Sequence, residues 1–140
     1  GDGILRGGNM TMLSMLCGTP YFLEDDSIED TILFLEDIGE APYKLDRILQ
    51  QWRLSGLLSR IKGLMLGTFT DCEGDEDEAD YDIGYEVLRY MEENRKRHLP
   101  DPFVCYVPTG HGTPHQTLPL GGHVHFRYIS NTIVLSPYTK

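Results

Sequence analysis

Apolar residues along the chain group into runs that predict buried strands separated by helical patterns. Residues 31–36, 63–70 and 103–107 are rich in β-branched, aliphatic or aromatic side chains, as buried strands are. After the first run, apolar residues recur at the i, i+3, i+4, i+7 spacing of an amphipathic helix, which we predict over residues 42–55. The apolar positions of this helix are Leu45, Ile48, Leu49 and Trp52.

A second helix is predicted after the acidic segment that runs from Asp71 to Asp82. Asp82 is a favourable N-cap residue, and we expect Val87, Leu88 and Met91 to face inward, with basic residues near the helix C-terminus at Arg95, Lys96 and Arg97. Strands that alternate with helices in the order β-α-β-α-β favour an α/β fold with a mostly parallel central sheet.

The two ends of the chain give further predictions. Residues 1–8 are glycine-rich and end in Gly7-Gly8, and Asn9 is placed to cap a short helix over residues 9–17. Near the other end, residues 124–128 and 132–135 alternate or run apolar around Ser130-Asn131, which predicts an antiparallel β-hairpin.

Composition and charge narrow the class of protein. The 140 residues amount to one domain, and a formal net charge of -10 argues against nucleic acid or an anionic membrane surface as a partner. No apolar run is long enough to span a bilayer. Three widely spaced cysteines, Cys17, Cys72 and Cys105, favour reduced thiols and hence a cytoplasmic location. The chain starts Gly1-Asp2-Gly3 without a methionine, so we expect it to be part of a longer protein.

Candidate chemistry lies where the predicted strands end. Glu36, Asp71 and His111 follow three strands of the predicted parallel sheet, and the carboxyl ends of such strands open toward one edge, the usual place for a ligand. Glu36 and His111 form a plausible pair, because a carboxylate on one imidazole nitrogen leaves the other free to accept a proton. We find no nucleophile to complete this pair: no serine lies in a G-x-S-x-G motif, and Cys72 has acidic neighbours that disfavour its thiolate.

Other interpretations of these residues remain open. The acids Glu36, Asp37 and Glu40 could only stabilise the helix that begins near Pro42, and Asn9 could be no more than a helix cap. The pairs His111 with His115 and His123 with His125 have spacings that can bind zinc, but no further ligand motif completes a site, and the acidic segment lacks the glycine of a calcium-binding EF-hand. We therefore predict no metal and no cofactor.

Several blocks of the chain, taken together and in order, resemble the C-terminal half of the LD-carboxypeptidase family. The blocks are Gly7-Gly8-Asn9, Gly18-Thr19-Pro20, residues 32–40, Pro42-Tyr43, Asp46-Arg47, residues 66–69, Gly110-His111-Gly112 and residues 117–121. This family comprises serine peptidases that include murein tetrapeptide carboxypeptidases and microcin C immunity peptidases. The resemblance covers nearly the whole chain, residues 1–140, and implies a swivelling-type β/α domain.

The resemblance also implies a Ser-Glu-His triad in which Glu36 orients His111, while the serine belongs to an N-terminal domain that is absent from this chain. It implies hydrolysis of an L,D-peptide bond that releases D-alanine from murein tetrapeptide during peptidoglycan recycling, and a homodimer. Asp37, Glu40 and Asn9 are candidate substrate-binding residues. A microcin-type peptidase that cuts a peptidyl-nucleotide amide is the alternative enzyme, and a non-catalytic binding or assembly domain is the alternative of another class.

Overall fold

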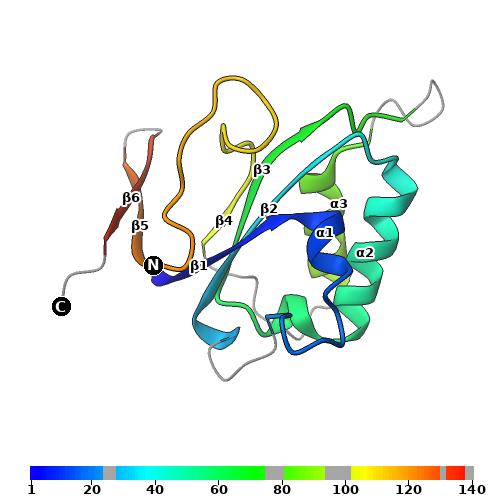
Figure 1. The fold of residues 1–140 in the computed structure, drawn as a ribbon, viewed down its shortest axis with the longest axis horizontal. Helices are drawn as coiled ribbons and strands as arrows, with labels where there is room; N and C mark the ends of the chain where they lie inside the picture. The colour runs from blue at the N-terminus through cyan, green and yellow to red at the C-terminus, as the bar shows by residue number, and fades with distance from the viewer. Residues whose placement is uncertain (24–27, 75–80, 94–101, 130–131, 138–140) are drawn as a thin grey trace.

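The computed structural model describes residues 1–23, 28–74, 81–93, 102–129 and 132–137, and its centre is one mostly parallel sheet. The strands lie in the order β4-β3-β2-β1-β5-β6 (Figure 1). Neighbours from β4 to β1 run parallel, whereas β5 runs antiparallel to both β1 and β6. Strand bounds are β1 Asp2–Asn9, β2 Thr31–Ile38, β3 Gly63–Thr70, β4 Phe103–Val104, β5 His123–Ile129 and β6 Thr132–Pro137. The predicted α/β fold with a C-terminal hairpin is confirmed; the hairpin turn, residues 130–131, lies outside the described residues.

Strand β1 was not predicted, although it occupies an internal position between β2 and β5. Its glycines hide the strand pattern, because glycine lacks a side chain to pack and is uncommon in strands. The fold requires glycine at position 7, where φ is +139°, because a Cβ there would lie 1.8 Å from the carbonyl oxygen of Phe34. The glycine-rich start of the chain is thus a strand, and at Gly7 it leaves no room for a side chain against β2.

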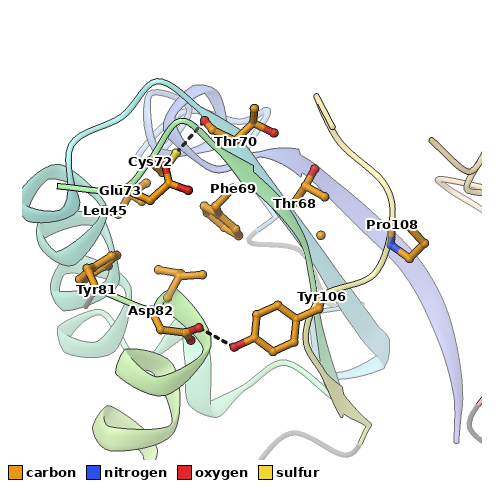
Figure 2. A pocket seen from close by; sticks show the side chains of 12 residues that line it. Leu45, Thr68, Phe69, Thr70, Cys72, Glu73, Tyr81, Asp82, Tyr106 and Pro108 are labelled. Carbon is orange, nitrogen blue, oxygen red and sulfur yellow. Dashed lines mark hydrogen bonds between the residues drawn. The ribbon is translucent and has the colours of Figure 1, made fainter. Parts of the chain in front are cut away.

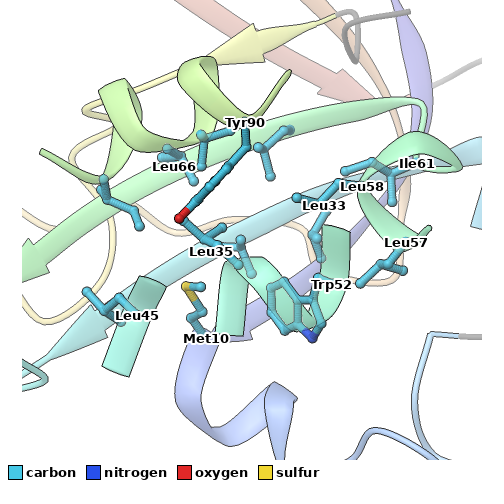
Figure 3. Close-up of a cluster of buried hydrophobic side chains, with 14 of the residues drawn as sticks. Met10, Leu33, Leu35, Leu45, Trp52, Leu57, Leu58, Ile61, Leu66 and Tyr90 are labelled. Carbon is cyan, nitrogen blue, oxygen red and sulfur yellow. The ribbon is translucent and has the colours of Figure 1, made fainter. Parts of the chain in front are cut away.

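The helices cover one face of the sheet (Figure 1). They are α1 Met10–Ser14, α2 Pro42–Leu54 and α3 Ile83–Glu93, with short 3-10 turns η1 Ile28–Asp30 and η2 Leu57–Ser59. Figure 3 shows the resulting core, in which Leu33 and Leu35 of β2 and Trp52 of α2 belong to one cluster of buried side chains. A smaller core on the other face contains Phe34 and Met65, with Leu118 of the β4–β5 connection packed against it.

The predicted helices form, but the end of α1 and one residue expected to face inward on α3 differ from the prediction. Asn9 caps α1 as expected, since the Met12 N–H donates to Asn9 Oδ1 at 2.9 Å, but the helix ends at Ser14 rather than residue 17. Asp82 caps α3 by accepting from the Tyr85 N–H at 2.8 Å. The prediction for Leu88 was wrong: its side chain is 37% exposed, whereas Val87 is fully buried. The side chain of Met91, the basic residues Arg95, Lys96 and Arg97, and residues 75–80 of the acidic segment lie outside the described residues.

The third predicted strand, residues 103–107, is interrupted after Val104. Tyr106 has a φ of +61°, which lies outside the β region, and its hydroxyl donates to Asp82 Oδ2. The chain then returns to the sheet, because the Val107 N–H donates to the carbonyl of Leu66 at 3.0 Å. None of the helices in the described ranges has the length and apolar character that a membrane span requires.

Candidate active site

The end of β2 places two neighbouring carboxylates on opposite faces of the sheet. Successive side chains of a strand alternate between faces, so Asp37 follows Leu33 and Leu35 toward the helices, while Glu36 follows Phe34 toward the smaller core. Both are buried, with exposed fractions of 6% for Glu36 and 1% for Asp37. A buried carboxylate needs polar partners, and each of these two acids has different ones.

A β-bulge lies beside Glu36. Leu35 pairs with Leu66 of β3 and Asp37 pairs with Phe69, so Glu36 faces two residues, Gly67 and Thr68, rather than one. Bulges of this kind bend a strand and redirect side chains next to functional sites. Gly67 lets another backbone approach, because a Cβ there would lie 2.3 Å from the carbonyl oxygen of Thr109.

The segment after β4 forms a closed loop that carries His111. The Gln116 N–H donates to the carbonyl of Pro108 at 3.0 Å, and the Thr109 hydroxyl donates to the carbonyl of Gln116 at 3.1 Å, so the loop from residue 108 to 116 has joined ends. Its base is attached to β3 by a bond of 2.9 Å from the Thr68 N–H to the carbonyl of Thr109. The loop therefore has a fixed position above the end of β3.

His111 and Glu36 meet at this position. His111 Nδ1 lies 2.7 Å from Glu36 Oε2, although the two residues are 75 positions apart in the chain. The histidine side chain is 49% exposed and the glutamate side chain 8%. When Nδ1–H donates to the carboxylate, Nε2 is the free acceptor, and a buried acid orients a ring that solvent or a partner can reach.

The pair opens onto a cavity of about 430 Å³. Its walls combine polar groups of the loop with apolar side chains, among them Phe34, Leu118 and Leu120. Among the described residues, those that line the cavity include no serine and no cysteine. The arrangement can hold a general base in place.

Asp37 and Asn9 bind each other rather than facing this cavity. Asp37 Oδ1 accepts from Asn9 Nδ2 at 2.7 Å and from the Ile38 N–H at 2.9 Å, while Oδ2 accepts from the Thr11 N–H at 2.9 Å. Asp37 therefore stabilises the start of α1, not the helix that begins at Pro42. A substrate-binding role for Asp37 and Asn9 stays a prediction.

Glu40 and Asp71 also lie apart from the Glu36–His111 pair. Glu40 forms an ion pair of 2.9 Å with Lys44 of α2, and a substrate-binding role for it stays a prediction. The hydrogen bond and the charge of Glu40 raise the pKa of Lys44. Asp71 is exposed in the turn after β3, with a φ of +51°, and does not line the cavity. Of the three residues predicted to meet at the strand ends, Glu36 and His111 do so and Asp71 does not.

The histidines weighed for zinc have other neighbours. His115 Nδ1 lies 2.8 Å from the carbonyl oxygen of Gly110, so this ring sits against the loop that carries His111. Within the part of the chain that the structure describes, no cluster of three or more histidine, cysteine or acidic side chains could hold a metal ion. The described residues offer no candidate metal centre.

A second cavity, of about 470 Å³, lies on the other side of β3, near α2 and α3 (Figure 2). Cys72 lines it, and burial raises the pKa of the Cys72 thiol, with the negative charge of Asp37 a smaller cause. The thiol is therefore a weak nucleophile. The sequence correctly predicted that the thiolate of Cys72 is disfavoured. It attributed this to acidic neighbours, whereas burial is the main cause of the raised thiol pKa.

No role was predicted from the sequence for Thr68 and Thr109, which fasten the loop to β3, although Thr68 lies in the block of residues 66–69. A single threonine at the end of a strand is too common to stand out. The alternating faces of Glu36 and Asp37, in contrast, could have been predicted from the two-residue period of a strand.

Comparison with known proteins identifies relatives of this arrangement. A family model of the LD-carboxypeptidase C-terminal domain matches residues 2–126. The murein tetrapeptide carboxypeptidase of Pseudomonas aeruginosa is 32% identical over 120 residues, which cover 86% of this chain and 36% of that protein.

Solved structures agree with this match. The crystal structure of muramoyltetrapeptide carboxypeptidase from Oxalobacter formigenes is similar with a TM-score of 0.75 and 35% identity, over 96% of this chain and 45% of that one. MccF in complex with glutamyl sulfamoyl guanosine has a TM-score of 0.70 at 21% identity, over 88% of this chain and 34% of that one, which is a likeness of fold.

The chain spans only part of these relatives. It covers between 33% and 40% of the length of six relatives that each align with at least 85% of it. The matched family model and the similarity along nearly the whole chain lead to one conclusion. This chain belongs to the LD-carboxypeptidase family and corresponds to its C-terminal domain.

Proposed function

We propose that this chain supplies the glutamate and histidine of a Ser-Glu-His triad in a serine carboxypeptidase that cleaves an L,D-peptide bond. The observation that carries the proposal is the 2.7 Å contact between His111 Nδ1 and Glu36 Oε2, with the glutamate buried and the ring half-exposed at a cavity. A serine of the N-terminal domain of the same protein completes the triad.

Each residue has a defined task in this reaction. The serine hydroxyl attacks the carbonyl carbon of the scissile amide while His111 Nε2 accepts its proton. Glu36 keeps the imidazole in the tautomer with hydrogen on Nδ1 and stabilises the imidazolium that forms. His111 then protonates the leaving amine, and a water molecule hydrolyses the acyl-enzyme with the same histidine as base.

The proposed substrate is murein tetrapeptide, from which the enzyme releases the terminal D-alanine. The names of the Pseudomonas and Oxalobacter relatives support this class of substrate. We place the protein in the cytoplasm, in line with its three free cysteines, and propose that it is a homodimer. Direct measurements of location and of solution mass test these two parts separately.

The proposal is tested in the full-length protein with two substitutions and a control. His111→Ala and Glu36→Gln are expected to lower kcat for D-alanine release from murein tetrapeptide by about 10³-fold or more, as loss of triad members does in other serine hydrolases. Glu86→Gln, which alters a partly buried acid paired with Arg89 on α3, is the matched control and keeps wild-type activity. Full activity of His111→Ala would reject the triad.

A second candidate is a peptidase that cuts a peptidyl-nucleotide amide. The fold similarity to MccF, a protein described in complex with glutamyl sulfamoyl guanosine, favours including it. Assays of the full-length protein with both substrates separate the two: a higher kcat/KM for the nucleotide conjugate would replace the first proposal. No hydrolysis of either substrate would favour a binding or assembly domain.

A further inference from the structure

The hydroxyl of Thr68 lies between β3 and the loop that carries His111. The Gly112 N–H donates to Thr68 Oγ1 at 3.3 Å, and Thr68 Oγ1 donates to the carbonyl of Thr109 at 3.2 Å. These contacts lie on the two sides of His111 in the sequence. A single hydroxyl makes both, because it is at once a donor and an acceptor.

Thr68 reaches this place because of the β-bulge. It is the second of the two β3 residues opposite Glu36, so it sits beside the acid that holds the imidazole. Figure 2 shows Thr68 at the edge of β3, next to the segment that carries Pro108. The loop packs tightly here: a Cβ on Gly110 would lie 2.6 Å from Thr68 Oγ1 and 2.8 Å from Glu36 Oε2.

Glu36 alone does not fix the direction of the imidazole. One hydrogen bond to Nδ1 leaves the ring free to pivot with its backbone, and the histidine side chain is half-exposed, so few packing contacts restrain it. Two bonds to backbone groups on either side of His111 restrain that backbone. Errors of about 1 Å in the position of a catalytic group lower rates by about 100-fold.

We infer that Thr68 is a positioning residue, which holds the backbone on both sides of His111 so that Nε2 points toward the incoming serine. This inference rests on the proposed function for its effect on catalysis. Its structural part, that the Thr68 hydroxyl holds the Gly112 N–H and adds to the bond from the Thr68 N–H to the carbonyl of Thr109, is independent of any reaction.

Three variants of the full-length protein test the inference. Thr68→Val keeps the shape of threonine and removes the hydroxyl, whereas Thr68→Ser keeps the hydroxyl and removes a methyl group. Thr70→Val is the matched control, since it makes the same change two residues further along β3, beyond the residues that contact the loop. If Thr68→Val does not fold, Thr68→Ala replaces it.

The kinetic readout is the rate of D-alanine release. We expect Thr68→Val to lower kcat by about 10- to 100-fold while KM changes less than about 3-fold, because the substrate is bound but the base is misdirected. Thr68→Ser and Thr70→Val are expected to stay within about 3-fold of wild type. A kcat for Thr68→Val equal to that of wild type, or a loss in Thr68→Ser as large as in Thr68→Val, would overturn the inference.

The second readout is amide hydrogen exchange of residues 110–112 without substrate. Exchange at Gly112 is expected to become at least about 10-fold faster in Thr68→Val, because its hydrogen-bond acceptor is gone, and to stay unchanged in Thr68→Ser and Thr70→Val. Unchanged protection in Thr68→Val would overturn the inference whatever the protein catalyses. If the protein has no peptidase activity, this readout still decides whether Thr68 holds the loop.

Discussion

At the scale of single residues, the contact between Glu36 and His111 depends on the absence of a side chain at Gly110. This glycine has a φ of +128°, and the loop passes so close to Glu36 that a Cβ would lie 2.9 Å from the glutamate Cβ. Both the backbone conformation and the space therefore exclude other residues at this position.

We predict that Gly110→Ala lowers the free energy of unfolding of the chain by at least about 2 kcal/mol, because backbone strain and a steric overlap add. Urea unfolding measures this change. Gly18→Ala is the control: its φ of +79° imposes strain, but nothing lies within 4 Å of the added Cβ. The control should lose about 1 kcal/mol, and an equal loss in both variants would contradict the overlap at Gly110.

Tyr106 gives a prediction about pH. The hydrogen bond from its hydroxyl to the Asp82 carboxylate raises the pKa of Tyr106 to about 12, above the value of 10.0 for an unperturbed tyrosine. Because the folded state favours the protonated hydroxyl, its bond to Asp82 stabilises the fold fully below about pH 10. This stabilisation is lost as the pH rises through about 12.

The measurement is the difference in unfolding free energy between wild type and Tyr106→Phe between pH 8 and pH 12. We expect wild type to be more stable at pH 8 and the difference to shrink as Tyr106 ionises. Taking the difference removes the contribution of the other tyrosines. A constant difference over this range would show that the hydroxyl does not bind Asp82.

At the scale of elements, the adjacent acids Glu36 and Asp37 at the end of β2 have different structural roles. Glu36 faces the loop that carries His111, whereas Asp37 faces α1 and accepts three hydrogen bonds, from Asn9, Thr11 and its neighbour Ile38. We predict that Asp37→Ala lowers the free energy of unfolding by about 2–4 kcal/mol, because it removes a buried acceptor and leaves the part-buried donors of Asn9 and Thr11 without their partner. Urea unfolding and KM together check this: a stable variant with a raised KM would instead support substrate binding by Asp37.

Strand β1 gives a second prediction at this scale, through two adjacent glycines. Gly7→Ala is expected to cost about 3 kcal/mol or more, because its Cβ would collide with the backbone of Phe34 on β2. Gly8→Ala meets nothing within 4 Å and should cost about 1 kcal/mol, from the strain of its φ of +151°. Thermal unfolding of both variants tests the pairing of β1 with β2, and equal stability would contradict it.

At the scale of the whole molecule, the sheet gathers groups that the chain keeps far apart. Its parallel strands end at one edge, where the loop that carries His111 closes over Glu36 and the cavity opens. The residues that line this cavity in the described structure lack a serine. A domain that carries a serine has to meet this edge for the proposed chemistry.

We therefore predict that the 140-residue chain alone releases no D-alanine from murein tetrapeptide, whereas the full-length protein does. The comparison uses equal molar amounts in the same assay, with His111→Ala of the full-length protein as the blank. Turnover by the isolated chain that depends on His111 would reveal a nucleophile within it.

The sequence by itself determined the elements whose signals are local. The 3.6-residue period of Leu45, Leu49 and Trp52 specifies α2, and the apolar runs specify β2 and β3, because burial of one face follows from the spacing of apolar residues. The same reasoning placed Glu36 at a strand end. Glycine-rich β1 escaped it, since its place in the sheet depends on contacts with β2 and β5.

Only the tertiary structure decided which groups meet. The third predicted strand ends early because Tyr106 has a positive φ and is bonded to Asp82. The bulge opposite Glu36 arises from the pairing of β2 with β3. The loop that carries His111 closes through bonds between Thr68, Thr109 and Gly112. These contacts join residues 24 to 75 positions apart, and no local pattern encodes them, because distant segments come together only when the whole sheet forms.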